Sequence, residues 1–220
     1  MRQRWSAILL DILGVQLEAD LSHAVPGSLL VANHISFLDI YALNAAQPAA
    51  FISKAEVRQW PIIGWLAATN DTVFLNRGSR GHARRVNAEI AEKLNAGQYV
   101  ALFPEGTTTD GTHLLNFHAA LIQPALTANR PVVPVAISYW EPDGTRSLAP
   151  RYDGEISLGE CLRAVASRKR LIVRVVSCPA LGQDGGDRRT VAAAARAVIA
   201  TAAALPPPHR APERPAGLPD

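Results

Sequence analysis

The sequence predicts a single α/β domain: a mostly parallel, mixed sheet flanked by helices, with an amphipathic N-terminal helix and a disordered C-terminal tail. Short apolar runs alternate with longer segments of helical periodicity, and this alternation is typical of α/β domains. The runs are apolar at nearly every position, as in strands that helices cover on both faces. A chain of 220 residues with 48% hydrophobic and 19% charged residues fits one core, and its composition excludes a disordered chain, a collagen and a coiled coil.

The apolar runs predict the strands. The first expected strand is half-buried, because Val15, Leu17 and Ala19 alternate with polar residues over 15–20. The other expected strands cover 28–33, 49–53, 73–75, 99–103, 132–138 and 171–176, with a short one at 156–158.

Helical periodicity predicts a first helix over 2–13, with Gly14 suited to its end. Its apolar stripe has two interpretations, packing on the core or lying in a membrane interface, so residues 1–14 are treated as a separate packing or membrane-contact helix. Further helices are expected at 42–46, 80–96, 117–126, from Glu160 onward and at 188–204. The main domain is expected to cover 15–205, and the Pro-rich segment 206–220 a disordered tail.

The charge and cysteine content limits the classes of partner. The formal net charge is only +3, which permits binding to phosphates or anionic surfaces but does not require nucleic acid. The two cysteines, Cys161 and Cys178, form neither a disulfide framework nor a metal pattern, and are expected to be buried free thiols. We see no apolar stretch of about 20 residues and no secretory signal, so the chain is expected to be soluble or peripheral to a membrane.

Three polar segments follow expected strands, where the sites of parallel sheets gather. The first, 33–39, holds His34 and Asp39, which are too far round one helix to meet unless a turn separates them. With Ser36 as the N-cap of a helix, the carboxylate could face the imidazole and favour its protonated form. Such a pair can deprotonate a hydroxyl, although a solvent-facing His beside a helix-start acid would give the same spacing.

The second and third segments are suited to anions and polyhydroxyl groups. Arg77 follows the strand at 73–75 and precedes a helix, a position that suits a phosphate, although a solvated basic helix face is the plainer interpretation of its neighbours. The third segment, 102–111, combines a Pro, an acid, glycines and hydroxyls at a strand end; a surface turn would have a similar composition.

Taken in order, these segments resemble the four motifs of the glycerolipid acyltransferase family, whose bacterial type is the 1-acylglycerol-3-phosphate acyltransferase. Asn33-His34-x-Ser36-x-x-Asp39 matches the first motif, and Phe74 and Arg77 match the second, although Asp71 stands where the family has Gly. The Phe-Pro-Glu-Gly-Thr motif is matched in full by 103–107, and a Pro-containing strand at 132–135 matches the fourth.

The resemblance implies an O-acyltransferase that moves a fatty acyl group from a thioester to a lysolipid hydroxyl. It implies His34 as general base and Asp39 as the residue that orients it, with Arg77 on the phosphate of the acceptor. The remaining residues implied in acceptor binding are Phe103, Pro104, Glu105, Gly106 and Thr107.

The expected acceptor is 1-acylglycerol-3-phosphate, giving phosphatidic acid, and the expected donor is an acyl-carrier protein or acyl-CoA thioester. No cofactor, metal or nucleic acid is expected. The expected location is peripheral, at the cytoplasmic face of the inner membrane. Three alternatives remain open: lyso-ornithine lipid as acceptor, which the sequence FPEGTTTDG favours; a hydrolase in which His34 activates water; and a non-catalytic lipid-binding protein.

Overall fold

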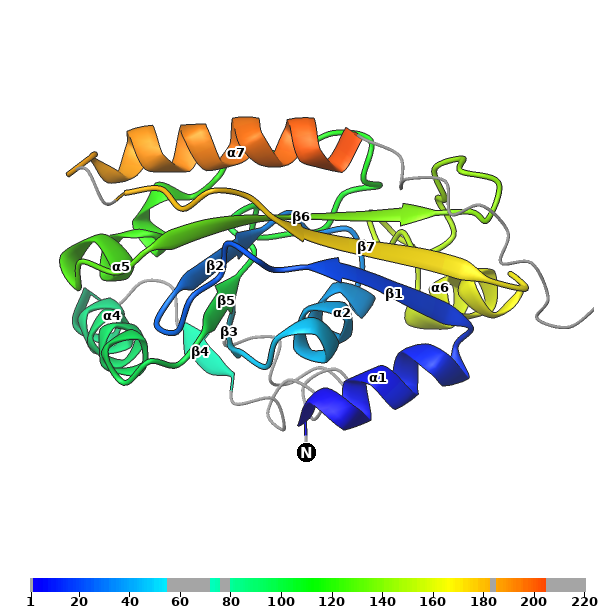
Figure 1. The fold of residues 1–220 in the computed structure, drawn as a ribbon, viewed down its shortest axis with the longest axis horizontal. Helices are drawn as coiled ribbons and strands as arrows, with labels where there is room; N and C mark the ends of the chain where they lie inside the picture. Colours follow the sequence, from blue (N-terminus) through cyan, green and yellow to red (C-terminus); the bar gives the residue numbers. More distant parts are fainter. Residues whose placement is uncertain (1, 55–71, 76–79, 183–184, 205–220) are drawn as a thin grey trace, which may run out of the picture.

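A computed structural model describes residues 2–54, 72–75, 80–182 and 185–204. Within these residues the chain forms one sheet of seven strands in the order β1-β7-β6-β2-β5-β3-β4 (Figure 1). The strands are β1 (Val15–Asp20), β2 (Leu29–Ala32), β3 (Ala50–Lys54), β4 (Val73–Leu75), β5 (Val100–Leu102), β6 (Val132–Trp140) and β7 (Leu171–Ser177). The predicted fold class, a mostly parallel mixed sheet flanked by helices, is confirmed.

The direction of the strands determines which loops lie together. β6 and β7 pair antiparallel, with Ile137 opposite Val175, whereas β2 is parallel to both of its neighbours, β5 and β6. β3 is parallel to β4 and to β5. The strands β2, β4, β5 and β6 therefore all end at the same edge of the sheet.

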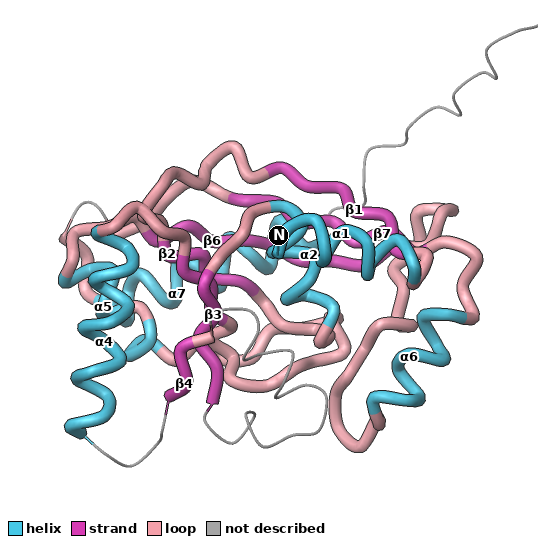
Figure 2. Tube along the Cα trace, turned by 90° about the horizontal axis from the view of Figure 1, so that it is seen from below, coloured by secondary structure: helices cyan, strands magenta, loops and turns pink. Residues whose placement is uncertain are grey.

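Helices cover both faces of the sheet (Figures 1 and 2). They are α1 (Arg2–Ile12), α2 (Leu38–Ala46), α4 (Arg80–Asn95), α5 (Gln123–Thr127), α6 (Leu158–Ala166) and α7 (Arg188–Ala204), with a 3-10 turn, η2 (Ala119–Leu121). One hydrophobic cluster joins α1 and α2 to one face, and a second joins α4, α5 and α7 to the other.

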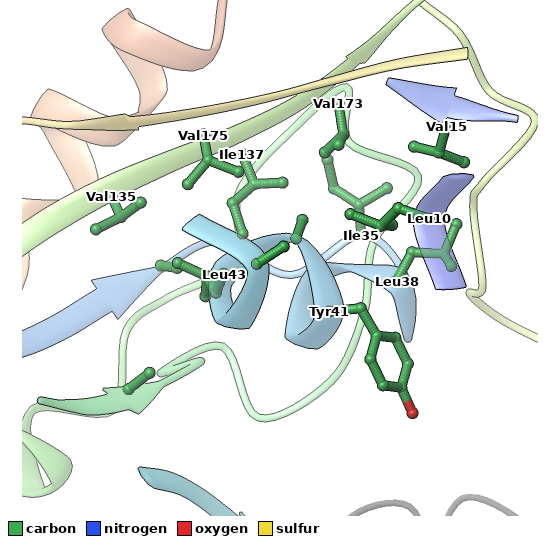
Figure 3. Close-up of a cluster of buried hydrophobic side chains, with 14 of the residues drawn as sticks. Leu10, Val15, Ile35, Leu38, Tyr41, Leu43, Val135, Ile137, Val173 and Val175 are labelled. Carbon is green, nitrogen blue, oxygen red and sulfur yellow. The ribbon is translucent and has the colours of Figure 1, made fainter. Parts of the chain in front are cut away.

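The cluster under α2 is the one that supports the candidate site. Leu38 and Leu43 of α2 belong to this cluster together with Val135 and Ile137 of β6, and all four side chains are fully buried (Figure 3). Burying an aliphatic side chain of this size stabilises the fold by about 1.5–3 kcal/mol. The start of α2 is thus anchored to the middle of the sheet.

Three expectations from the sequence are wrong. Residues 156–158 form no strand: Ser157 is the N-cap of α6, and a capping box with Glu160 starts that helix. The helix expected at 117–126 is divided into η2 and the short helix α5, which has Pro124 in its first turn. Ser36 is not the N-cap of α2, because that helix begins at Leu38 with Phe37 in the capping position.

Cys161 and Cys178 are both free and buried, as expected. The expected tail, 206–220, lies outside the described residues.

Candidate active site

The structure brings His34 and Asp39 together. His34 lies two residues after the end of β2, and Asp39 is the second residue of α2. The intervening turn closes the five-residue separation, so that His34 Nδ1 lies 2.9 Å from Asp39 Oδ2. The His34 side chain is 17% exposed and that of Asp39 is 0% exposed. The ring can therefore meet a substrate, while the carboxylate meets only protein.

The buried carboxylate of Asp39 is held by donors on both oxygens. Oδ2 also accepts the backbone N–H groups of Ile35 at 2.7 Å and Ser36 at 2.9 Å. The carboxylate reaches back from the first turn of α2 to the amides of the turn that precedes the helix. A fully desolvated carboxylate is costly unless donors surround it, so these bonds make the buried position of Asp39 tolerable and fix its orientation.

Tyr139 is a site residue that the sequence did not reveal. This β6 tyrosine donates its hydroxyl to Asp39 Oδ1 at 2.7 Å and is 1% exposed. Burial, followed by the charge of Asp39, raises the pKa of Tyr139 well above its usual value. The hydroxyl therefore stays protonated and remains a donor to the carboxylate. One hundred residues separate the partners, so only the pairing of β2 with β6 could reveal the contact.

Asn33 explains how β2 and β6 stay in register at this point. Its side-chain Nδ2 donates to the Ile137 carbonyl at 2.9 Å, and its Oδ1 accepts the Ile137 N–H at 2.8 Å. The amide side chain replaces a backbone peptide just beyond the end of β2. It fixes the strand from which His34 emerges, beside the strand that carries Tyr139.

The loop after β5 surrounds His34. The ring of Phe103 stacks on the imidazole with 3.9 Å between centroids and 9° between planes. Glu105 Oε1 accepts the His34 N–H at 2.9 Å, and the Thr109 N–H donates to the His34 carbonyl at 2.9 Å. Both backbone groups of His34 are therefore bonded to this one loop.

Other parts of the third motif have different surroundings. The Pro104 carbonyl accepts the His118 N–H at 2.9 Å, and Gly106 has a φ of +72°, a conformation that favours glycine. Thr107 is exposed, and among the predicted acceptor residues of this loop it is the one whose side chain faces solvent most openly.

Arg77, the predicted phosphate ligand, lies outside the described residues. β4 ends at Leu75, at the same sheet edge as the loops that carry His34 and Glu105. Within the described part of the chain, no group of three or more His, Cys, Asp or Glu side chains is placed to hold a metal ion.

The arrangement has the chemical properties of a general base. With Nδ1 bonded to the carboxylate, the other ring nitrogen, Nε2, is left to accept a proton from a hydroxyl. Asp39 holds the ring orientation and stabilises the imidazolium that forms. The fold and this pair define an α/β domain with a His–Asp base at the carboxyl edge of a parallel sheet.

Comparison with known proteins places the chain in a family. The acyltransferase family model matches residues 17–138, which include His34, Asp39 and the loop of Phe103 to Thr107. The chain belongs to the acyltransferase family, as its motifs predicted.

The chain is similar to two kinds of relative, whose names give different acceptors. The 1-acyl-sn-glycerol-3-phosphate acyltransferase of Neisseria meningitidis is 40% identical over 163 residues, which cover 74% of this chain and 64% of that protein. The lyso-ornithine lipid O-acyltransferase of Pseudomonas aeruginosa is 39% identical over 196 residues, which cover 87% of this chain and 75% of that protein. The chain thus spans just under two thirds of the length of the Neisseria relative.

A solved structure has the same fold. The 1-acyl-sn-glycerophosphate (LPA) acyltransferase PlsC of Thermotoga maritima superposes with a TM-score of 0.65 at 22% identity, over 93% of this chain and 79% of that one.

Proposed function

We propose that the chain is an O-acyltransferase that moves a fatty acyl group from a thioester to the hydroxyl of a lysolipid. The observation that carries the proposal is the His34–Asp39 pair, with 2.9 Å between Nδ1 and Oδ2 in a partly exposed position. Membership of the acyltransferase family supports it.

In the proposed reaction His34 Nε2 takes the proton of the acceptor hydroxyl as its oxygen attacks the thioester carbonyl. The new C–O ester bond forms and the C–S bond breaks, and the imidazolium returns the proton to the leaving thiolate. The Asp39 carboxylate offsets the positive charge that forms on the ring. General-base help of this kind contributes about 10²–10⁴-fold to the rate.

The proposed acceptor is 1-acylglycerol-3-phosphate, with phosphatidic acid as product, and Arg77 is the proposed ligand of its phosphate. Lyso-ornithine lipid is the second candidate, because the relative of that name aligns over more of this chain. Thr107, the exposed hydroxyl of the third motif, is retained as a proposed acceptor contact.

The acceptor and donor can be tested together on purified protein. Each acceptor is presented in phospholipid vesicles with acyl-carrier-protein or acyl-CoA thioester as donor, and ester formation is measured. We expect transfer to one acceptor and a loss of at least about 10²-fold in His34→Ala. Fatty acid release without acceptor would support a hydrolase, and lipid binding without turnover a non-catalytic protein. No added cofactor or metal should be needed.

We also propose that α1 contacts the membrane surface. Trp5 is 43%, Ile8 50% and Ile12 75% exposed, while Leu10, on the inner side of the same helix, is 2% exposed. An amphipathic helix with an open apolar stripe can lie in the headgroup region of a bilayer. Among the described residues, no helix has both the length and the apolar character that crossing a bilayer requires.

A row of aromatic contacts connects α1 with the turn between His34 and Asp39. Trp5 meets Tyr41 edge-on at 5.6 Å, and Phe37 contacts Tyr41 at 6.5 Å and Tyr152 at 6.1 Å between centroids. Phe37 lies between His34 and Asp39 in the sequence. This row supports the proposal that a membrane-bound α1 holds the site near its lipid acceptor. The proposed location is peripheral, at the cytoplasmic face of the inner membrane.

A further inference from the structure

We infer that Glu105 is a positioning residue for His34, and that its carboxylate does not bind the acceptor. This inference rests on the proposed function, because it states which part of the acyl transfer Glu105 serves. In this inference the third motif holds the general base in place. The motif alone predicts a different role for Glu105, binding of the acceptor.

Both oxygens of the Glu105 carboxylate are already bonded to backbone amides. Oε1 accepts the His34 N–H at 2.9 Å, and Oε2 accepts the Leu115 N–H at 2.8 Å. The side chain is 4% exposed. It therefore joins the peptide of the base to a loop ten residues further along the chain, and little of it can meet a ligand.

The charge of Glu105 is unsuited to the phosphate of 1-acylglycerol-3-phosphate. A carboxylate can only accept hydrogen bonds, and it repels a phosphate. Burial raises the pKa of Glu105, and the two backbone hydrogen bonds oppose that shift. These amides are the donors that make the buried position tolerable.

The rest of the loop acts on the same residue. Phe103 stacks on the imidazole, and the Thr109 N–H holds the His34 carbonyl at 2.9 Å. The ring, the N–H and the C=O of His34 are thus each contacted by one loop. A base must lie within hydrogen-bond reach of its proton, and small displacements are costly to the rate.

The segment at Leu114 and Leu115, whose amide Glu105 binds, is also held by α7 on the other face of the sheet. Arg196 of α7 donates to the carbonyls of Leu115 at 2.8 Å and Leu114 at 2.6 Å. The Leu115 N–H is the group that Glu105 Oε2 accepts. Glu105 therefore links the His34 peptide, just after β2, to the Leu115 peptide, which α7 holds in place.

The test is the steady-state kinetics of Glu105→Gln with the acceptor that the wild type uses. The amide keeps the size of the side chain but sets an NH₂ group against one of the two backbone N–H groups. We expect kcat to fall at least about tenfold while the KM for the acceptor stays within about twofold, since the lost interaction orients the base. Glu89→Gln, on the exposed face of α4, is the matched control and should leave both constants unchanged.

A direct binding measurement separates the two roles without turnover. Equilibrium binding of the same acceptor is compared between His34→Ala and the double variant His34→Ala/Glu105→Gln. Equal affinities are expected. A loss of about tenfold or more in affinity, or a rise in KM with unchanged kcat, would overturn the inference and place Glu105 on the acceptor.

A second variant is available if Glu105→Gln fails to fold, which thermal unfolding would show. Phe103→Leu removes the flat surface behind the imidazole without changing any charge, and it should also lower kcat and spare KM. A Phe103→Leu variant that raised KM alone would contradict the role assigned to the loop. If the wild type transfers no acyl group to either acceptor, the proposed function fails first, and the binding comparison, made with each of the two acceptors in turn, still decides whether Glu105 touches the lipid.

Discussion

The surroundings of His34 and the outer face of α1 are opposite kinds of surface. Around His34, buried polar groups are paired with one another: Asp39 is fully buried and Glu105 is 4% exposed, and each accepts several donors. On α1, Ile8 and Ile12 are apolar and exposed. Buried polar groups demand partners, whereas exposed apolar groups gain by finding a surface.

We expect the residues around His34 to determine the chemistry and the outer face of α1 to determine binding to the membrane. Substitutions around His34 are expected to change the rate constant and the stability together, because each polar group there balances another. Substitutions on the outer face of α1 are expected to change only the partition between water and lipid.

Asp39→Asn should have the largest effect in this set. The amide removes the charge that stabilises the imidazolium, and its NH₂ group opposes some of the donors that Asp39 accepts. We expect kcat to fall about 10²-fold or more. Steady-state kinetics on folded protein checks this, with the exposed Asp143→Asn as control. An Asp39→Asn enzyme with near wild-type kcat would exclude Asp39 from the mechanism.

Tyr139→Phe removes one donor from the same carboxylate and leaves the ring in place. A hydrogen bond to a charged group contributes about 1.5–3 kcal/mol, so the free energy of unfolding should fall by about that amount. We expect kcat to fall about tenfold, because Asp39 becomes less firmly oriented. Urea unfolding and kinetics are compared with Tyr99→Phe, a partly buried tyrosine of the core edge. Equal effects of the two substitutions would mean that the Tyr139 hydroxyl has no special role.

The double variant Ile8→Ser/Ile12→Ser should change location alone. Both side chains are at least half exposed, so the stability should stay within about 0.5 kcal/mol of wild type, while binding to phospholipid vesicles falls about tenfold. Sedimentation with vesicles measures the binding. Leu10→Ser, on the inner side of α1, should instead destabilise the protein by about 2–5 kcal/mol. Undiminished vesicle binding in the double variant would show that α1 is not the contact surface.

The sequence predicts the sheet better than the contacts between its loops. The strand at 73–75 and the helix at 188–204 have the bounds expected from their apolar patterns, because those patterns reflect local burial. The apolar neighbours of Ser157 predict a strand, but a capping box, Ser157 followed three residues later by Glu160, starts a helix there instead.

The candidate site shows the same limit. His34 and Asp39 could be predicted as a pair because they lie in one short motif. The link from Asp39 to Tyr139 spans 100 residues, and the two bonds of Glu105 end on backbone amides, which have no signature in the sequence. Tertiary hydrogen bonds to the backbone depend on strand order, and the sequence alone did not determine that order.

The proposed mechanism requires above all that His34 and Asp39 act as one unit, and a double-variant cycle tests this most directly. Acyl transfer is measured in His34→Ala, in Asp39→Asn and in the variant that carries both. Because Asp39 acts only through His34, the double variant should be no slower than His34→Ala alone. If the two losses multiply instead, the residues act independently, and the His34–Asp39 base is not the mechanism.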